Sequence, residues 1–584
     1  MSHHFLVALV AVLVFAGCMV SPPSLMDDVD AVQAQIAHNM LQSGDWVTAR
    51  LDGIAYLEKS PLKYWMMAVS FMIFGVHDWA ARIPIALASV LLCLVAARFA
   101  AWAFGPRAGL YSGLVLATCV GLFLFTRILI PDVILTLMIT LALWGLMRAM
   151  DEEEAHPTRW ALVMWAAMAT GLLLKGLIAA VIPVAAALLF LGLSRQLFVG
   201  RTWTRLRPFS GILLALLIAA PWHVLATVRN PPIFDFTMHS ESGSYHGFFW
   251  FYFINEHVLR FLNLRYPRDY NTVPRLYFWL FHLLWLFPWS VYFPAALRLH
   301  YREVNRASRT RLLALCWCGF VLFFFTFSTT QEYYSMPCYP ALALLLGSAI
   351  DSEDRLLRFG TKAIAVVATL AALVIAAVLW MVRGMPAPGD IAAALNQNPE
   401  VYTLSLGHMT DLTLRAFAYL RLPLAVAGVA FAIGAIGAWR RSAAVPLAPL
   451  AAMMVLFFHA ARLALVVFDP YMSSRPLAQA LLDSPPGKLI VDDQYYTFSS
   501  VFFYTNRRAL LLNGRVNNLE YGSYAPDAPQ DVFIDDAALQ RLWTSPERYY
   551  LLAEGPRMPA ITRLLDNHLS YIKQAGGKFL ITNQ

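Results

Sequence analysis

One short stretch, Leu51 to Trp65, carries residue types that could do chemistry at a membrane surface. It reads LDGIAYLEKSPLKYW and places Glu58 beside Lys59, with tyrosines and a tryptophan around them. Aromatic rings of this kind favour the headgroup level of a bilayer. A lysine there can hold a phosphate as a point charge, and a glutamate can ligate a metal or orient its neighbour. An isolated pair is explained more simply by charges that snorkel from an interfacial helix.

Polar residues recur at the ends of apolar segments on the same predicted side of the membrane. They are Asp27, Asp28, Asp30, Arg127, Asp132, Lys175, Glu256, His257, Arg260, Gln331, Glu332, Tyr333 and Tyr334. Ionisable groups at such depth are costly and are functional candidates by default. Each one alone is explained by snorkelling or by a structural pair. Together, cations for a phosphate and carboxylates for a proton indicate an enzyme that acts on a lipid-linked phosphate.

The composition is that of a membrane protein. Of the 584 residues, 59% are hydrophobic and only 14% are charged, and the mean hydropathy is +0.57. These values exclude the soluble globular class and demand many membrane spans. The net charge of +8 is attributed to arginines in cytoplasmic loops, so a nucleic-acid partner is not expected. The six cysteines lie in or beside apolar segments, which predicts no disulfide framework.

About thirteen apolar segments meet the length criterion for a membrane span. Their approximate limits are 5–21, 82–104, 108–126, 131–149, 160–174, 176–194, 209–228, 276–297, 312–328, 333–350, 362–383, 418–438 and 444–468. Arginine and lysine cluster in alternate breaks, which places those breaks and the N-terminus in the cytoplasm. The loops predicted to lie outside are then 22–81, 229–275 and 384–417. The first segment is interpreted as a retained span, with cleavage as a signal peptide as the alternative.

The segments predicted to lie outside have structure of their own. Val32, Ile36 and Met40 recur four apart, which predicts a helix over 30–42 with one apolar stripe. A second, interfacial helix is predicted over 56–74. After residue 469, β-rich runs alternate with helical patterns, which indicates a small α/β domain over 469–584 that follows a membrane domain over 1–468. The predicted strands are 488–491, 508–512, 532–534, 549–552 and 579–582, and the predicted helices are 476–482 and 558–567.

The opening stretch resembles the G-x-x-Y-x-E-K-P-P-L-x-Y-W segment of the dolichyl-phosphate-mannose protein mannosyltransferase-like glycosyltransferases, which include the aminoarabinose transferases of lipid A. The likeness continues in order through 34–46, 127–136, 171–183, 255–262, 287–290 and 327–347. This family belongs to the GT-C superfamily, which uses polyprenyl-phosphate sugars. The resemblance implies a polytopic α-helical membrane protein of the bacterial inner membrane, with a periplasmic C-terminal α/β domain that is similar to the family in architecture only.

The resemblance also implies roles for individual residues. The lipid phosphate would be held at Tyr56, Lys59, Arg260, Tyr333 and Tyr334. Glu58 and His257 match positions that bind a divalent metal in the lipid A branch, and with two ligands a zinc, magnesium or manganese ion would be labile. An acidic residue in the first loop would be the general base, and Asp132 would assist it.

The first loop departs from the family pattern. Counted back from MLQSGDW, the family's Asp-Glu pair falls on Val29 and Asp30, and Asp28 lies one residue earlier. We predict that Asp28 is the general base, with Asp30 as the second candidate. Lys63 also differs from the residues common at its place in the family.

The predicted function is an inverting glycosyltransferase with membrane lipids around it and a sugar donor on undecaprenyl phosphate. The acceptor stays open between lipid A, a protein and another envelope glycan. One alternative is a lipid or solute transporter, although transporters tend to place their polar groups near the midplane and this chain places them on one face. A sensor built around the C-terminal domain is weaker, because that domain carries no ligand fingerprint.

Overall fold

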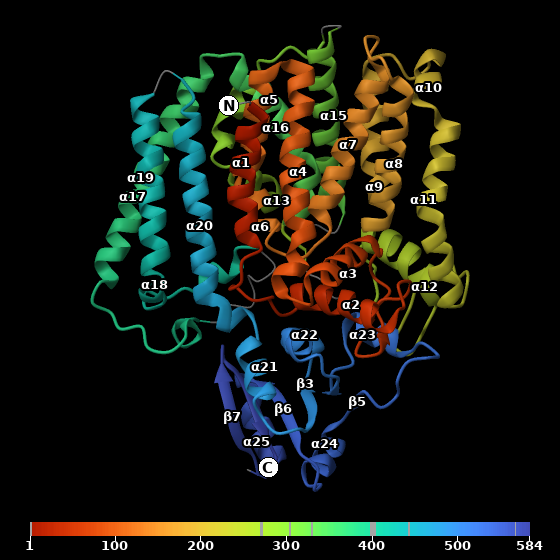
Figure 1. Cartoon of the computed structure of the whole chain (residues 1–584), viewed down its shortest axis with the longest axis vertical. Coiled ribbons are helices and arrows are strands. Elements are labelled where there is room, and N and C mark those ends of the chain that lie inside the picture. Colours follow the sequence, from red (N-terminus) through yellow and green to blue (C-terminus); the bar gives the residue numbers. More distant parts are fainter. Residues whose placement is uncertain are drawn as a thin grey trace.

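The computed structural model describes residues 3–268, 272–302, 305–328, 331–396, 405–441, 444–566 and 568–584, with only the backbone of Cys18. A bundle of helices forms one end of the molecule and an α/β domain forms the other (Figure 1). The first loop, residues 22–81, lies between them. The N-terminus is at the far end of the bundle, and the C-terminus is in the α/β domain.

Each predicted span coincides with one helix of the bundle or with a pair of short ones. The helices are α1 (His3–Phe15), α4 (Asp78–Phe104), α5 (Pro106–Thr118), α6 (Val120–Phe125), α7 (Asp132–Met150), α8 (Pro157–Lys175), α9 (Ile178–Leu193), α10 (Gly200–Leu206), α11 (Pro208–Arg229), α13 (Arg275–Trp285), α14 (Phe293–Ala296), α15 (Arg306–Phe327), α16 (Tyr339–Asp351), α17 (Leu356–Val382), α18 (Ala416–Tyr419), α19 (Arg421–Arg440) and α20 (Leu447–Met472). Large apolar side chains such as Leu370, Leu373 and Trp380 are exposed on α17, as expected of a helix that faces lipid.

Seven spans among the described residues are long and apolar enough to cross a membrane, with α10 and α11 counted together. An eighth is reached if residues 275–285 and 289–296, bent by 93°, form one span. The chain is therefore a multi-pass membrane protein. The predicted number of about thirteen spans is not confirmed by length and composition, although α1, α5, α8, α9 and α16 run alongside the long helices (Figure 1).

The first loop folds into α2 (Asp30–Ser43), a hairpin of β1 (Arg50–Leu51) and β2 (Ile54–Ala55), and α3 (Leu62–Phe74). The helix predicted over 30–42 is confirmed. It is buried beyond its apolar stripe, because Gln33, Gln35 and His38 are buried as well. The helix predicted to start at Tyr56 begins only at Leu62, since the Tyr56 amide extends the hairpin by donating to the Ala49 carbonyl oxygen at 2.8 Å.

The second loop, residues 229–275, contains α12 (Gly247–Phe249) and a π-helix over Trp250–Leu259. A π-helix is rare and often marks a functional site. Here it carries Glu256 and His257, and Arg260 follows at its end. The wider turn of this helix changes which side chains share a face, so sequence spacing alone could not orient them.

The C-terminal domain is a six-stranded sheet with the order β5-β4-β3-β6-β8-β7. Strands β3 (Lys488–Asp492), β4 (Ala509–Leu512), β5 (Phe533–Ile534) and β6 (Tyr549–Glu554) are parallel, and β7 (Ser570–Ala575) and β8 (Lys578–Thr582) are antiparallel. Its helices are α21 (Arg475–Leu482), α22 (Ser499–Thr505), α23 (Asn517–Ser523), α24 (Asp536–Trp543) and α25 (Met558–Leu564). The five predicted strands and the helix over 476–482 are confirmed; the helix over 558–567 ends at Leu564, and residue 567 lies outside the described residues.

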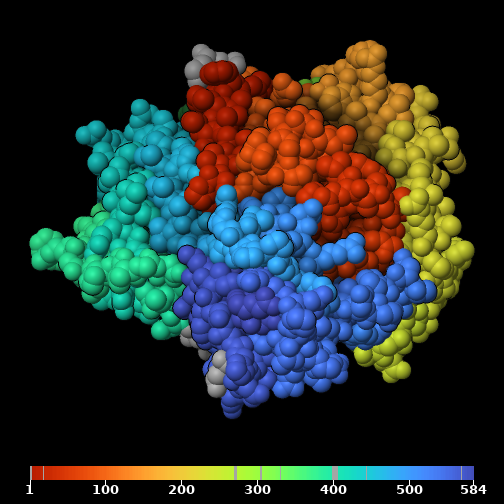
Figure 2. Space-filling view, turned by 60° about the horizontal axis from the view of Figure 1, so that its bottom comes forward, coloured from red at the N-terminus to blue at the C-terminus, as the bar shows by residue number. Residues whose placement is uncertain are grey.

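The C-terminal domain packs directly on the first loop, and Figure 2 shows its blue surface against the red one. Asp27 accepts hydrogen bonds from Lys578 at 2.7 Å and from Ser474 at 2.6 Å, and its other oxygen accepts from the Ser500 amide at 2.8 Å. The side chains of this ion pair are only 8% and 11% exposed. Asp27 therefore anchors the domain to the bundle and is not a solvated loop residue.

We predict that Asp27→Ala destabilises the protein by about 3 kcal/mol, because it leaves the Lys578 ammonium nearly buried without its carboxylate. The measurement is thermal unfolding of the detergent-solubilised protein. The control is Lys488→Ala, which breaks an ion pair with Glu547 whose side chains are 61% and 55% exposed and should lower the unfolding temperature much less. Equal losses in the two variants would show that the Asp27 pair does not anchor the domain.

Candidate functional site

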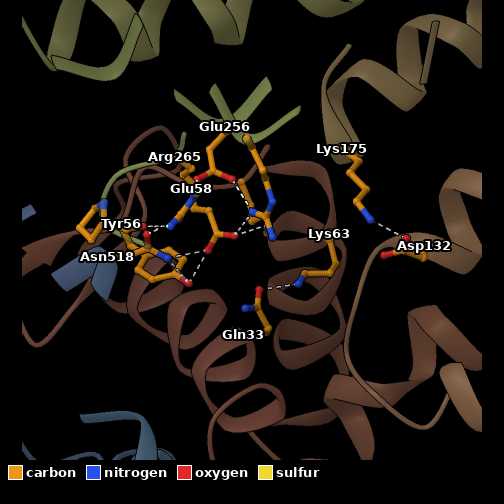
Figure 3. Close-up of polar contacts among 12 residues, drawn as sticks. Gln33, Tyr56, Glu58, Lys63, Asp132, Lys175, Glu256, Arg265 and Asn518 are labelled. Atoms are coloured by element: carbon orange, nitrogen blue, oxygen red, sulfur yellow. Dashed lines mark hydrogen bonds and ion pairs between the residues drawn. The ribbon is translucent and has the colours of Figure 1, made fainter. Parts of the chain in front are cut away.

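A cavity of about 420 Å³ lies where the bundle meets the first and second loops. Its acidic and basic lining residues are Glu58, Lys59, Asp132, Lys175, Glu256, His257 and Arg260. The rest of the lining is mostly apolar and includes Leu135, Ile178, Val181, Ile182, Phe324 and Phe325. The cavity thus combines charged side chains with an apolar lining, and Figure 3 shows the polar contacts among the charged side chains.

Glu58 is the centre of the polar contacts. Its carboxylate pairs with Lys59, accepts a hydrogen bond from the Tyr56 hydroxyl at 2.7 Å and another from the Asn518 amide at 2.8 Å, and lies 3.5 Å from Arg260. Burial alone would raise the pKa of Glu58, but Lys59 and then the two nearby arginines hold that pKa well below its usual range. Glu58 is therefore ionised and fixes Lys59 at the cavity.

Two arginines share Glu256. The Arg260 guanidinium donates to the Glu256 carboxylate at 2.7 Å and to the Tyr334 hydroxyl at 3.2 Å. Arg265, whose side chain is fully buried, pairs with the other oxygen of Glu256 and donates to the Asn518 carbonyl oxygen at 2.6 Å. Of these two arginines, only Arg260 lines the cavity. Arg265 lies outside the lining and contacts Arg260 indirectly, through the shared Glu256 carboxylate.

A third cation, Lys175, lines the same cavity from the last residue of α8. Its ammonium donates to the Asp132 carboxylate at 2.5 Å and lies 4.8 Å from the ring centre of Tyr334 and 5.2 Å from that of Tyr333. Asp132 is the first residue of α7, and its second oxygen is buried without a hydrogen-bond partner among the described residues. Asp132 is also one of the residues that line the cavity.

The structure brings most of the predicted site residues together. Those that line the cavity or contact its charged groups are Tyr56, Glu58, Lys59, Asp132, His257, Arg260, Tyr333 and Tyr334. Asp28 and Asp30 are not in the lining. Asp28 is exposed with a φ of 71°, and its amide donates to Tyr496 and Ser499 of the C-terminal domain.

Asp30 is fully buried, and one of its oxygens accepts from the Leu129 amide at 2.8 Å. Burial raises the pKa of Asp30, although Arg82 and the Leu129 amide oppose this shift. Through this hydrogen bond, Asp30 connects α2 to the segment before α7. Either first-loop aspartate would need the loop to move before it could meet a substrate in the cavity.

Lys63, the departure noted in the sequence, lies in the same region. Its side chain is 2% exposed, and its ammonium donates to the Gln33 amide oxygen and, at 2.9 Å, to the Leu129 carbonyl oxygen. Burial, and next the charge of Lys59, lower the pKa of Lys63 to about 7. Lys63 thus ties α3 to α2 and to the segment before α7.

The predicted metal ligands, Glu58 and His257, do not fit a metal ion. The His257 Nε2 atom accepts a hydrogen bond from the Leu177 amide at 3.1 Å, and Nδ1 donates to the Tyr252 carbonyl oxygen. Burial lowers the pKa of His257, as suits this neutral form. Both ring nitrogens are therefore occupied, and the described part of the chain holds no group of three His, Cys, Asp or Glu that could bind a metal.

Two functional candidates had no signal in the sequence. Arg265 lies in an irregular loop, and Asn518 lies in the C-terminal domain, 460 residues from Glu58. Lys175 was noted as a polar residue between spans, but no role was assigned to it. Only the fold shows that Arg265 and Asn518 meet the cluster around Glu58 and Glu256, and that Lys175 pairs with Asp132 beside it.

We predict a pH-dependent effect of Lys63→Met on stability. An unfolded lysine titrates near 10.4, so between about pH 7 and pH 10 the unfolded chain binds more protons at Lys63 than the folded chain does. This group therefore favours folding increasingly as the pH rises and penalises it most below about pH 7. The melting temperature of Lys63→Met, relative to the wild type, should be higher at about pH 6.5 than at about pH 9.

The control for this experiment is Lys573→Met, which replaces an exposed lysine of β7. The difference in melting temperature between Lys573→Met and the wild type should be the same at both pH values. If the difference in melting temperature between Lys63→Met and the wild type were also the same at both pH values, Lys63 would have an ordinary pKa and would not be buried as described.

Comparison with known proteins finds similarity in sequence and in fold. Residues 58–224 match a family model described as dolichyl-phosphate-mannose-protein mannosyltransferase. Relatives named undecaprenyl phosphate-alpha-4-amino-4-deoxy-L-arabinose arabinosyl transferase include those of Pectobacterium carotovorum, 27% identical over 339 residues, and Pseudomonas aeruginosa, 31% identical over 337 residues. These alignments cover 56% and 55% of each chain, so this chain spans little more than half the length of the relatives it matches.

A solved structure matches nearly the whole chain. It is the crystal structure of ArnT from Cupriavidus metallidurans bound to undecaprenyl phosphate, with a TM-score of 0.78 and 22% identity over 99% of this chain and 97% of the other. The apo form of the same protein gives a TM-score of 0.75 with 23% identity over 99% and 97%. These matches confirm the predicted resemblance: the chain has the fold of ArnT from Cupriavidus metallidurans and is similar in sequence to the undecaprenyl phosphate–aminoarabinose arabinosyl transferases.

Proposed function

We propose that this chain is a glycosyltransferase that moves a sugar from a polyprenyl phosphate to an acceptor of the cell envelope. The observation that carries the proposal is the mixed lining of the cavity. Lys59, Lys175 and Arg260 line it together with leucine, isoleucine, valine and phenylalanine side chains. A lipid with an isoprenoid chain and a phosphate head group matches both kinds of lining.

The cations suit the charge that the reaction develops. The acceptor oxygen attacks the anomeric carbon, the bond from that carbon to the phosphate oxygen breaks, and the electron pair stays on the phosphate. The phosphate gains one negative charge, so Lys59, Lys175 and Arg260 stabilise the departing group more than the bound donor. A single displacement inverts the anomeric centre.

A carboxylate must take the proton of the acceptor hydroxyl. Glu58 and Glu256 are each engaged by two or more donors, whereas one oxygen of Asp132 has no partner among the described residues and the residue lines the cavity. This favours Asp132 over Asp28 and Asp30 as the base in the described conformation.

The names of the relatives suggest undecaprenyl phosphate as the lipid carrier and 4-amino-4-deoxy-L-arabinose as the sugar. Lipid A, a protein or another envelope glycan would be the acceptor. The arginine distribution supports an inner-membrane protein with a cytoplasmic N-terminus and its site and C-terminal domain in the periplasm. A transporter is less well supported, because the chain has the fold of a glycosyltransferase, ArnT from Cupriavidus metallidurans.

We predict that Lys59→Met lowers transfer by about 10²–10³-fold, because a cation that stabilises the leaving phosphate is lost. Glu58 keeps Tyr56, Asn518 and Arg260 as partners, so the variant should fold. The measurement is mass spectrometry of lipid A, glycoproteins and envelope glycans from cells with and without the gene, complemented with each variant. Lys573→Met is the control, and full complementation by Lys59→Met would refute the phosphate role.

We predict that Asp132→Asn lowers kcat by about 10²–10⁴-fold, because an amide cannot accept the hydroxyl proton. Asp28→Asn should leave kcat close to the wild-type value, since its side chain lies outside the cavity. Single-turnover kinetics with a purified donor would measure both. The reverse outcome, with Asp28→Asn inactive, would assign the base to the first loop and require that loop to close over the substrate.

A further inference from the structure

The helix α23 of the C-terminal domain contacts both loops that build the cavity. The Tyr521 hydroxyl donates to the Gly247 carbonyl oxygen at 3.0 Å, and its ring packs on Phe251 with centroids 4.2 Å apart. Glu520 accepts hydrogen bonds from Tyr266 at 2.8 Å and from Ser242 at 3.0 Å. These contacts hold α23 on the second loop.

On the first loop, α23 approaches the backbone of the hairpin. A Cβ atom at Gly522 would lie 2.0 Å from the Ala55 carbonyl oxygen, so only glycine allows this approach. The helix is thereby pressed against β2, three residues before Glu58. Its place leaves one side chain, Asn518, directed at the charged cluster (Figure 3).

Asn518 is 4% exposed and connects groups of opposite charge. Its amide nitrogen donates to the Glu58 carboxylate at 2.8 Å and lies 3.3 Å from the Tyr56 hydroxyl oxygen, and its carbonyl oxygen accepts from Arg265 at 2.6 Å. A carboxamide is the side chain that can donate to a carboxylate at one atom and accept from a guanidinium at the other. It joins the first loop to the second.

We propose that Asn518 is a positioning residue of the site, through which the C-terminal domain fixes Glu58 and thereby Lys59 in the geometry that binds a lipid phosphate. This inference rests on the proposed function for its ligand, but its structural part does not. Asn518 does not line the cavity and touches no substrate. It acts by holding the carboxylate that in turn holds the ammonium.

The contacts with Glu58 and Arg265 require the amide group of Asn518, because another polar group would not satisfy both. With Asn518→Ala, Glu58 and Arg265 each lose a buried hydrogen-bond partner. With Asn518→Asp, the new carboxylate keeps the contact with Arg265 but faces Glu58 with a like charge. A proton shared between the two carboxylates restores a donor, so the Asn518→Asp defect should shrink as the pH falls.

The first test is binding of undecaprenyl phosphate to the detergent-solubilised full chain, followed by tryptophan fluorescence. Asn518→Ala and Asn518→Asp should each raise Kd about ten-fold, the scale of one lost hydrogen bond to a charged group. The loss in Asn518→Asp should be partly recovered at lower pH, whereas wild-type binding should not improve. Gln540→Glu, an exposed amide-to-carboxylate change in α24, is the matched control and should bind as the wild type does.

The second test needs no ligand. Hydrogen–deuterium exchange of the full chain should become faster at residues 54–60 in Asn518→Ala, and should stay at the wild-type rate there in Gln540→Glu. Unchanged exchange at residues 54–60 in Asn518→Ala would overturn the proposal. So would an unchanged Kd in Asn518→Ala and Asn518→Asp, provided that the wild-type protein binds the lipid. If the wild type does not bind undecaprenyl phosphate, the proposed function fails, and the exchange comparison still decides the role of Asn518.

Discussion

Pairing of buried charges determines how this site is built. Each of the three cations at the cavity is held by a carboxylate, and each carboxylate comes from a different part of the chain. Removing a charge from water costs several kcal/mol, so a lone cation at this depth would destabilise the fold. The pairs offset this cost. Under the proposed function they would also make phosphate recognition selective, because an anion must outcompete carboxylates that are already in place.

Most of the fold was accessible from the sequence, because its strongest signals are long apolar segments and short β-rich runs. The predicted spans coincide with helices, and five of the six strands of the C-terminal sheet were predicted. The start of α3 was missed because Tyr56 looks helical in pattern while its amide belongs to the hairpin. Strand β7 was missed because it is an edge strand with mostly exposed side chains and therefore shows little apolar alternation.

The site was predictable where a motif carried it. Glu58, Lys59, Arg260 and the Tyr333–Tyr334 pair converge as expected from their ordered motifs. The position of the first-loop aspartates was not predictable, since it depends on how α2 is covered by the C-terminal domain. Asn518 could not be found at all, because nothing in a single sequence links an asparagine of the C-terminal domain to a glutamate of the first loop.

The contact of α23 with the hairpin also bears on how the protein is made. Domains generally fold from the N-terminus as the chain is synthesised, so the helices of the bundle and the first loop are in place before Asn518 leaves the ribosome. Until the C-terminal sheet has folded, Glu58 and Arg265 lack the amide that joins them. A nascent or truncated chain would thus reside in the membrane with its proposed lipid site incomplete. The site would become able to bind its ligand only at the last step of biosynthesis.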